Sequence, residues 1–119
     1  MTETALHSAT VTPVSGRVHV FFDDAEIASS LKAMRLERQG GAPLVFVPLE
    51  DVHPGILEAS DTVREEPGPG KAHFYTIKTL TADGVDEAWY YPYAEGDYAA
   101  IRDMLTFGGD RVRIEVTEV

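Results

Sequence analysis

The chain has 119 residues, of which 44% are hydrophobic and 25% are charged, and this is the composition of a globular protein with a single domain. Its formal net charge of −10 argues against nucleic-acid binding, which requires clustered Lys and Arg, and its lack of cysteine excludes disulfides and thiolate chemistry. No apolar run approaches the roughly 20 residues that span a membrane, and the N-terminus lacks signal-peptide features, so we expect a cytoplasmic protein that binds no membrane.

The first predicted strand covers residues 17–22. Val18, Val20 and Phe22 alternate there with residues that would face the opposite side of a sheet, which is the period of a half-buried strand. The preceding residues 1–16 are rich in Thr, Ser and Ala, and we expect a flexible lead-in with one short edge strand at 9–14. The single β-rich domain is therefore predicted over residues 17–119.

Residues 24–39 allow two interpretations. Ile27, Leu31 and Met34 are spaced like one face of a helix, whereas Met34 and Leu36 alternate with charged residues as in a strand. Helix propensity favours the first interpretation, and the family resemblance described below favours strands, which is the alternative we adopt.

The remaining predicted elements are mostly strands. We expect a buried strand at 44–47, a connection over 49–57, and a hairpin in which strands 73–80 and 87–91 are joined by a turn at 82–84. Residues 97–105 have the spacing of a helix, with Asp97 as its cap, and residues 111–116 alternate as a final strand. The fold class predicted is mainly β: a small antiparallel β sandwich or rolled sheet with one short helix.

Several segments together resemble a bacterial family, the domain of unknown function 427, which also carries a nucleotidyltransferase label. The matching segments are RVHV at 17–20, ASS at 28–30, KAMR at 32–35, FVPLEDV at 46–52, SDT at 60–62, PGPGKAHFY at 67–75, WYYP at 89–92, and Phe107 with DRV at 110–112. The resemblance implies a compact β-rich domain and no agreed activity. One departure matters, because the family usually has Cys-Pro-Tyr-Lys-Gly where this chain has EPGPG at 66–70, so the thiol and the amine of that motif are absent.

Three familiar kinds of site are not supported by the sequence. The GPGK segment at 68–71 lacks the upstream Gly and the downstream Ser or Thr of a phosphate-binding loop. The nucleotidyltransferase label would require paired carboxylates for two metal ions, and the pair Glu95 and Asp97 is more simply the start of a helix. The four histidines lack metal-ligand spacing, so we expect neither a metal nor another cofactor.

The strongest candidate site follows the Pro-Gly stretch. His73 and Tyr75 would share one face of a strand, where an imidazole and a phenol could serve as base and acid. The alternative, which the residue types alone favour, is that Tyr75 packs in the core and His73 lies at its rim. Asp61 could act as a general base or could cap its own turn. We take His73, Asp61 and Tyr75 as the candidate catalytic residues.

Four further residues are candidates for substrate binding. Trp89 and Tyr91 would stand beside the aromatic strand, either lining a small-molecule pocket or filling the core. Arg35 could bind a substrate carboxylate or pair with an acid, and Glu50 allows the same site and turn interpretations as Asp61.

These candidates lead to two hypotheses from different classes. The first is a small-molecule-binding protein of bacterial metabolism, acting as a cofactor-independent acid–base enzyme of the isomerase, cyclase or lyase type in an aromatic pocket. The alternative is a non-catalytic interaction module that uses the same aromatic face, including contact between two copies in a homodimer.

Overall fold

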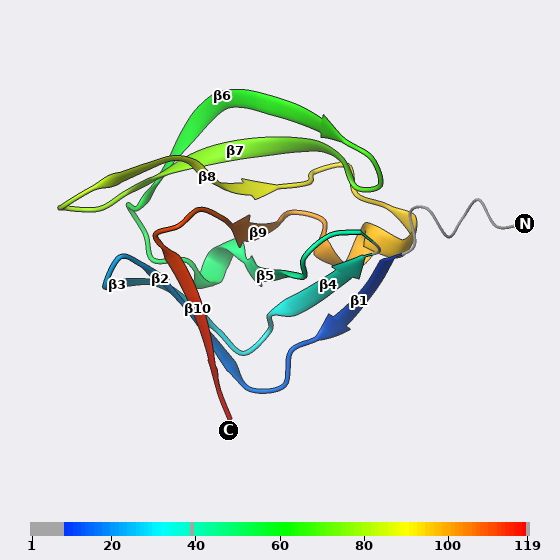
Figure 1. Ribbon diagram of the computed structural model, residues 1–119, viewed down its shortest axis with the longest axis horizontal. Coiled ribbons are helices and arrows are strands. Elements are labelled where there is room, and N and C mark those ends of the chain that lie inside the picture. The colour runs from blue at the N-terminus through cyan, green and yellow to red at the C-terminus, as the bar shows by residue number, and fades with distance from the viewer. Residues whose placement is uncertain (1–8, 39, 119) are drawn as a thin grey trace, which may run out of the picture.

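The computed structural model describes residues 9–38 and 40–118, which form ten strands and two short 3-10 helices (Figure 1). The strands are β1 (Ala9–Pro13), β2 (Arg17–Phe22), β3 (Ala25–Ser30), β4 (Met34–Arg38), β5 (Leu44–Pro48), β6 (Leu57–Glu66), β7 (Gly70–Lys78), β8 (Asp83–Tyr90), β9 (Met104–Phe107) and β10 (Val112–Thr117). The 3-10 helices are η2 (Leu49–Asp51) and η3 (Gly96–Ile101).

The strands form two antiparallel sheets. The larger has seven strands in the order β1-β4-β5-β9-β8-β7-β6, and the smaller has three in the order β10-β2-β3. In Figure 1 the large sheet runs from β6 at the top, through β9 and β5, to β1 at the lower right, with the small sheet at the lower left. The predicted mainly β fold of two packed or rolled antiparallel sheets is confirmed.

The main core lies between the two sheets. Strand β2 has the predicted alternation, because Val18, Val20 and Phe22 are buried while His19 and Phe21 remain partly exposed on the outer face. These residues pack against a cluster contributed by both sheets: Ile27, Ala28, Ala33, Val47, Val52, Ile77, Ala88, Leu105 and Phe107. Burying one face of each sheet in this way supplies the hydrophobic stabilisation of the domain.

A second core covers the other face of the large sheet. Its centre is Tyr91, which is fully buried and tilted against Phe46 with 6.0 Å between ring centroids. Tyr98 and Ile101, the two buried residues of η3, close this core from outside, and β1 packs beside η3. Both faces of the seven-stranded sheet are therefore covered.

The strand interpretation of residues 24–39 is confirmed. Strand β3 pairs with β2 in the small sheet, whereas β4 pairs with β1 and β5 in the large sheet. The helical spacing was misleading because its members lie in different environments: Ile27 is buried, whereas Leu31 is 52% exposed in the connection between the sheets.

The predicted helix at 97–105 is wrong. The structure has only η3, which ends at Ile101, and Asp103 adopts a φ of 65° that turns the chain into β9. Asp97 is not its cap, since the N-cap position is Glu95, which makes no side-chain capping bond. Sheet pairing with both β5 and β8 outweighs the helical pattern, because it places Leu105 in the core between the sheets.

Strand β6 is also a correction, because no strand was predicted between the connection at 49–57 and the strand at 73–80. Ten residues form an edge strand paired with β7, and a bulge between Ala59 and Val63 interrupts the register. Within the proposed lead-in at 1–16, residues 9–13 form β1 as expected for a short edge strand, and residues 1–8 lie outside the described residues.

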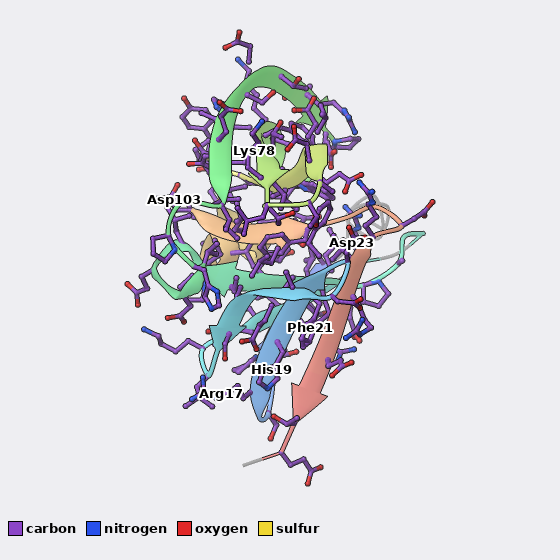
Figure 2. The ribbon with its side chains drawn as sticks, turned by 90° about the vertical axis from the view of Figure 1, so that its left-hand side faces the viewer. Arg17, His19, Phe21, Asp23, Lys78 and Asp103 are labelled. Atoms are coloured by element: carbon purple, nitrogen blue, oxygen red, sulfur yellow. The ribbon has the colours of Figure 1, made fainter. Side chains whose placement is uncertain are left out.

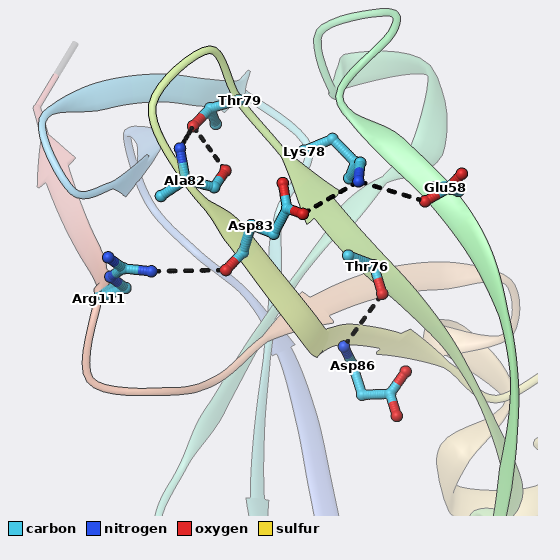
Figure 3. Close-up of polar contacts among 8 residues, drawn as sticks. All are labelled: Glu58, Thr76, Lys78, Thr79, Ala82, Asp83, Asp86 and Arg111. Atoms are coloured by element: carbon cyan, nitrogen blue, oxygen red, sulfur yellow. Dashed lines mark hydrogen bonds and ion pairs between the residues drawn. The ribbon is translucent and has the colours of Figure 1, made fainter.

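The hairpin turn lies earlier than predicted, at residues 79–82 rather than 82–84. The Thr79 backbone N–H donates to the Ala82 carbonyl oxygen at 3.0 Å. The Thr79 hydroxyl donates to the same oxygen at 2.9 Å and accepts from the Ala82 backbone N–H at 3.2 Å (Figure 3). At the base of this turn Lys78 bridges Asp83 at 3.0 Å and Glu58 at 3.7 Å, which joins β6, β7 and β8.

Gly68, in the turn between β6 and β7, and Gly70, the first residue of β7, test how closely this turn packs against Tyr98. Both have positive φ, 103° at Gly68 and 92° at Gly70, but a Cβ at Gly68 would lie 2.5 Å from the Tyr98 hydroxyl, whereas one at Gly70 would meet nothing within 4 Å. We expect Gly70→Ala to cost about 1 kcal/mol of unfolding free energy through backbone strain, and Gly68→Ala to cost at least about 1 kcal/mol more. Urea denaturation measures both, and equal losses would contradict the close approach to Tyr98.

Candidate functional site

The best candidate site is a pocket of about 190 Å³ on the face of the large sheet that turns toward the small sheet. Tyr75, Tyr90 and Leu105 come from the adjacent strands β7, β8 and β9, while Leu49 opens η2 and Asp103 precedes β9. Figure 2 shows Asp103 level with the large sheet, away from His19 on the small one. We call these five residues the tyrosine pocket.

Aromatic rings continue from this pocket along the sheet. His73 lies directly opposite Tyr90 in the β7–β8 register, with 5.6 Å between ring centroids. Tyr75 lies 5.7 Å from Tyr90 at an interplanar angle of 31°, and Tyr93 lies 6.2 Å from His73 edge to face. The predicted pair His73 and Tyr75 is thus placed at one aromatic cluster, in contact through Tyr90.

The electrostatics of the tyrosine pocket favour the neutral form of the Tyr90 phenol. Burial raises the pKa of Tyr90 above its ordinary value, and the neighbouring Tyr75, Asp103 and Tyr93 add to the increase. The Tyr90 hydroxyl therefore keeps its proton at neutral pH and is available as a hydrogen-bond donor. Asp103, an exposed acid at a left-handed φ of 65°, supplies the negative charge at the entrance.

Trp89 and Tyr91 do not line the tyrosine pocket. Trp89 pairs with Phe74 rather than with Tyr75, with 5.6 Å between ring centroids, so its side chain lies on the opposite face of the sheet. The expected wall of Tyr75, Trp89 and Tyr91 is therefore divided between the two faces. Tyr90, the residue between them in sequence, takes the place beside Tyr75.

On that opposite face, Trp89 and Tyr91 belong to a hydrogen-bonded chain. The Trp89 indole N–H donates to the Tyr91 hydroxyl at 2.9 Å, and this hydroxyl donates to the Glu66 carboxylate at 2.9 Å. Burial, together with the Glu66 hydrogen bond and charge, raises the pKa of Tyr91 to about 12 despite the opposing effect of the Trp89 hydrogen bond. Glu66 stands where the family resemblance places a cysteine, and its role here is to anchor a core tyrosine.

The other predicted site residues lie elsewhere. Asp61 is exposed within the β6 bulge, where the neighbouring Thr62 hydroxyl donates to Asp86 at 2.6 Å. Glu50 forms a surface ion pair with Lys32 at 2.5 Å. Arg35 on β4 is opposite Val45, and among the described residues the tyrosine pocket includes neither it, Asp61 nor Glu50.

Glu50 does border a neighbouring depression. This hollow of about 400 Å³ is shallow and shares Leu49 with the tyrosine pocket. Its other sides come from the chain between η2 and β6, including Val52 and His53. A ligand held in the tyrosine pocket would therefore have space to extend past Leu49.

Sequence reasoning missed four residues of the pocket: Leu49, Tyr90, Asp103 and Leu105. Trp89 and Tyr91 were expected beside the aromatic strand in place of Tyr90, because a shift of one residue in the register exchanges the two faces of a strand. Asp103 and Leu105 were hidden by the expected helix. The one available indication was the run of three consecutive aromatic residues, Trp89, Tyr90 and Tyr91, because neighbouring residues of a strand place their side chains on opposite faces.

Residues 9–38 and 40–118 contain neither a cluster of metal-binding side chains nor a helix that could span a membrane. Within these ranges no three His, Asp or Glu side chains are grouped so that they could hold a metal ion. The helices in the same part of the chain are too short to cross a membrane.

The chain of hydrogen bonds through Tyr91 predicts a loss of stability on removal of its hydroxyl. Tyr91→Phe leaves the Trp89 N–H and the Glu66 carboxylate without this partner, so we expect a loss of about 1–3 kcal/mol in unfolding free energy. Tyr93→Phe, at a side chain that is 66% exposed, should change stability by less than about 0.5 kcal/mol. Equal effects of the two substitutions in urea unfolding would contradict the assigned role of Tyr91.

The raised pKa of Tyr91 predicts a distinct pH dependence. Folded Tyr91 holds its proton more tightly than unfolded Tyr91, so this contribution to stability is complete below pH 10 and is lost as the pH rises from 10 towards 12. The loss should be on the order of 2 to 3 kcal/mol in the wild type and absent in Tyr91→Phe. Urea unfolding of both proteins across this range measures the difference, and parallel pH profiles would disprove it.

Comparison with known proteins places the chain in a family. The family model described as Domain of unknown function (DUF427), with the label NTP_transf_9, matches residues 10–118. No curated protein matches the chain. The matched region includes almost all of the described fold and every residue of the tyrosine pocket. The chain belongs to the DUF427 family.

Proposed function

We propose that this protein binds a small molecule in the tyrosine pocket and acts as a cytoplasmic, cofactor-independent protein of bacterial metabolism. The observation that carries the proposal is the convergence of two phenols, one carboxylate and two leucines from separate elements on one concavity. Apolar walls with a few polar groups are typical of small-molecule sites. The residues lining it are not consecutive, so the fold itself assembles the site.

The size of the tyrosine pocket limits what it accepts. Its volume of about 190 Å³ exceeds the roughly 150 Å³ cavity that binds benzene in an engineered protein core. One ring, or a branched group of similar size, therefore fills it. A larger ligand would place its remaining atoms in the depression beyond Leu49.

Acid–base chemistry is the catalytic form of this proposal. Asp103 would be the base and the Tyr90 hydroxyl, kept protonated by its raised pKa, would be the acid, because both border the same space. His73 contacts Tyr90 and would orient it. This replaces Asp61, which is on the edge strand, as the proposed carboxylate.

An interaction module is the second candidate. Tyr93 is 66% exposed and Leu49 is 48% exposed, so apolar surface is present beside the aromatic cluster and at the rim of the pocket. A homodimer that covers these side chains would use the same face for association and not for catalysis. Light scattering separates the two, since a dimer that Tyr93→Ser dissociates favours the interaction module and a monomer opposes it.

A pocket-filling variant tests small-molecule binding. Leu49→Trp should occupy the pocket from its rim at little cost in stability, because Leu49 is about half exposed, and Leu31→Trp is the matched control at 52% exposure outside the pocket. Single-ring compounds are screened by amide chemical-shift mapping. We expect hits that shift Tyr75, Tyr90 and Asp103, persist in Leu31→Trp and weaken at least about tenfold in Leu49→Trp.

Two results would count against the proposal. Shifts that map away from the pocket, or that respond equally to both Trp substitutions, would refute binding at this place. For the catalytic form, a hit with an acidic C–H is incubated in deuterated water, and exchange that Asp103→Asn does not slow would remove Asp103 as the base.

A further inference from the structure

The tyrosine pocket has a particular charge character in addition to its shape. Its lining combines the rings of Tyr75 and Tyr90 with the carboxylate of Asp103 and with two leucines, and no Lys or Arg is among its lining residues in the described chain. The two rings are adjacent, with 5.7 Å between their centroids and a tilt of 31°. An aromatic wall beside a carboxylate is suited to a cation, because the ring faces and the acid attract the same charge.

We propose that the tyrosine pocket selects a small molecule carrying a methylated ammonium group, which would lie against the rings of Tyr75 and Tyr90 with its charge toward Asp103. The inference rests on the proposed small-molecule function and specifies its ligand class. The pocket volume of about 190 Å³ is sufficient for a trimethylammonium group, since about 150 Å³ admits a benzene ring.

Hydration distinguishes a methylated ammonium from a primary one. A primary ammonium has three N–H donors, and burying it requires hydrogen-bond acceptors for each of them. The acceptor oxygens of the pocket are on Asp103, Tyr75 and Tyr90, whereas Leu49 and Leu105 offer none, so an N–H that is turned toward the leucines would have no partner. Methyl groups need no acceptors and gain from the apolar contact, so the lining suits the methylated cation.

The surrounding charges also favour a cationic ligand over an anionic one. Burial is the main cause that raises the pKa of Tyr90, and the neighbouring Tyr75, Asp103 and Tyr93 raise it further, so the charges around this phenol disfavour an added negative charge. The chain as a whole carries a formal net charge of −10, which attracts cations at long range and repels anionic metabolites. An anionic ligand would therefore be opposed both at the pocket and on approach.

Choline and its neutral isostere 3,3-dimethylbutan-1-ol test the inference directly. The two molecules have the same branched shape, and only choline is charged, so their affinities separate cation binding from filling of an apolar space. Amide chemical shifts of Tyr75, Tyr90 and Asp103 are followed during titration of the full chain. We expect choline to bind at least about tenfold more tightly than the isostere, equivalent to about 1.4 kcal/mol.

Two substitutions assign the selectivity to particular groups. Asp103→Asn removes the charge, and asparagine tolerates the left-handed φ of 65° at this position, so the backbone turn is retained. It should weaken choline binding about tenfold and leave the isostere unchanged. Tyr90→Phe keeps a ring for the cation and should preserve the preference for choline. Thermal unfolding confirms that each variant is folded, and the wild-type comparison of the two probes requires no variant.

The outcomes that would overturn the cation inference differ from those that would overturn the proposed small-molecule function. Equal affinities for choline and its isostere at the pocket, with no effect of Asp103→Asn, would overturn the cation inference while supporting the proposed small-molecule function. No response of the pocket resonances to choline would also overturn it, and the screen of single-ring compounds would then decide the broader function separately. Sedimentation with phosphatidylcholine vesicles, combined with no response to free choline, would overturn the assignment to a free small molecule.

Discussion

Strand β9 is the element on which the rest of the structure depends. Its four residues pair with β5 on one side and β8 on the other, so they join two groups of three strands into one seven-stranded sheet. Leu105 and Phe107 point toward the small sheet and enter the main core, while the buried Thr106 hydroxyl donates to the Val45 carbonyl oxygen at 2.8 Å on the other side. Because Leu105 also lines the tyrosine pocket, the same strand that closes the sheet supplies a wall of the site. The formation of the seven-stranded sheet and the assembly of the tyrosine pocket therefore both depend on the pairing of β9.

The two faces of β8 show how register assigns chemical roles. Trp89 faces the core beneath η3 and is tied through Tyr91 to Glu66, whereas Tyr90 faces the pocket and contacts both His73 and Tyr75. Neighbouring aromatic residues thus separate into a structural chain and a candidate binding group. The structural chain is buried and hydrogen-bonded, whereas the candidate binding group is partly exposed and lies next to a carboxylate. In the second, the phenols are partly exposed and so remain accessible, which a binding site requires.

The fold could be predicted where the sequence pattern was clear, as in the alternation of β2 and β10 and the apolar run of β5. For residues 24–39 the pattern allowed a helix as well, and only the family resemblance favoured strands. Strand β6 was missed because an edge strand with few apolar residues has no pattern that distinguishes it from a polar turn. Strand β9 was missed because the segment around Ile101 has helical spacing, and only pairing with distant strands decides its conformation. For the site, period two correctly placed His73 and Tyr75 together. The partners Tyr90 and Asp103 depend on hairpin register and on the turn before β9, which are non-local and are not encoded in residue spacing.

The polar sequence of β6 has a consequence for how the protein behaves at high concentration. This strand is the longest in the fold and forms an open edge of the large sheet, where unpaired backbone groups could template a further strand from another molecule. Its exposed side chains include Glu58, Asp61, Arg64 and Glu65, and its bulge breaks the flat register that such pairing needs. Adding a strand here would crowd these charges against a neighbour and leave the bulge unmatched. The residues that conceal β6 from sequence analysis are therefore the ones that keep this edge from seeding fibrils.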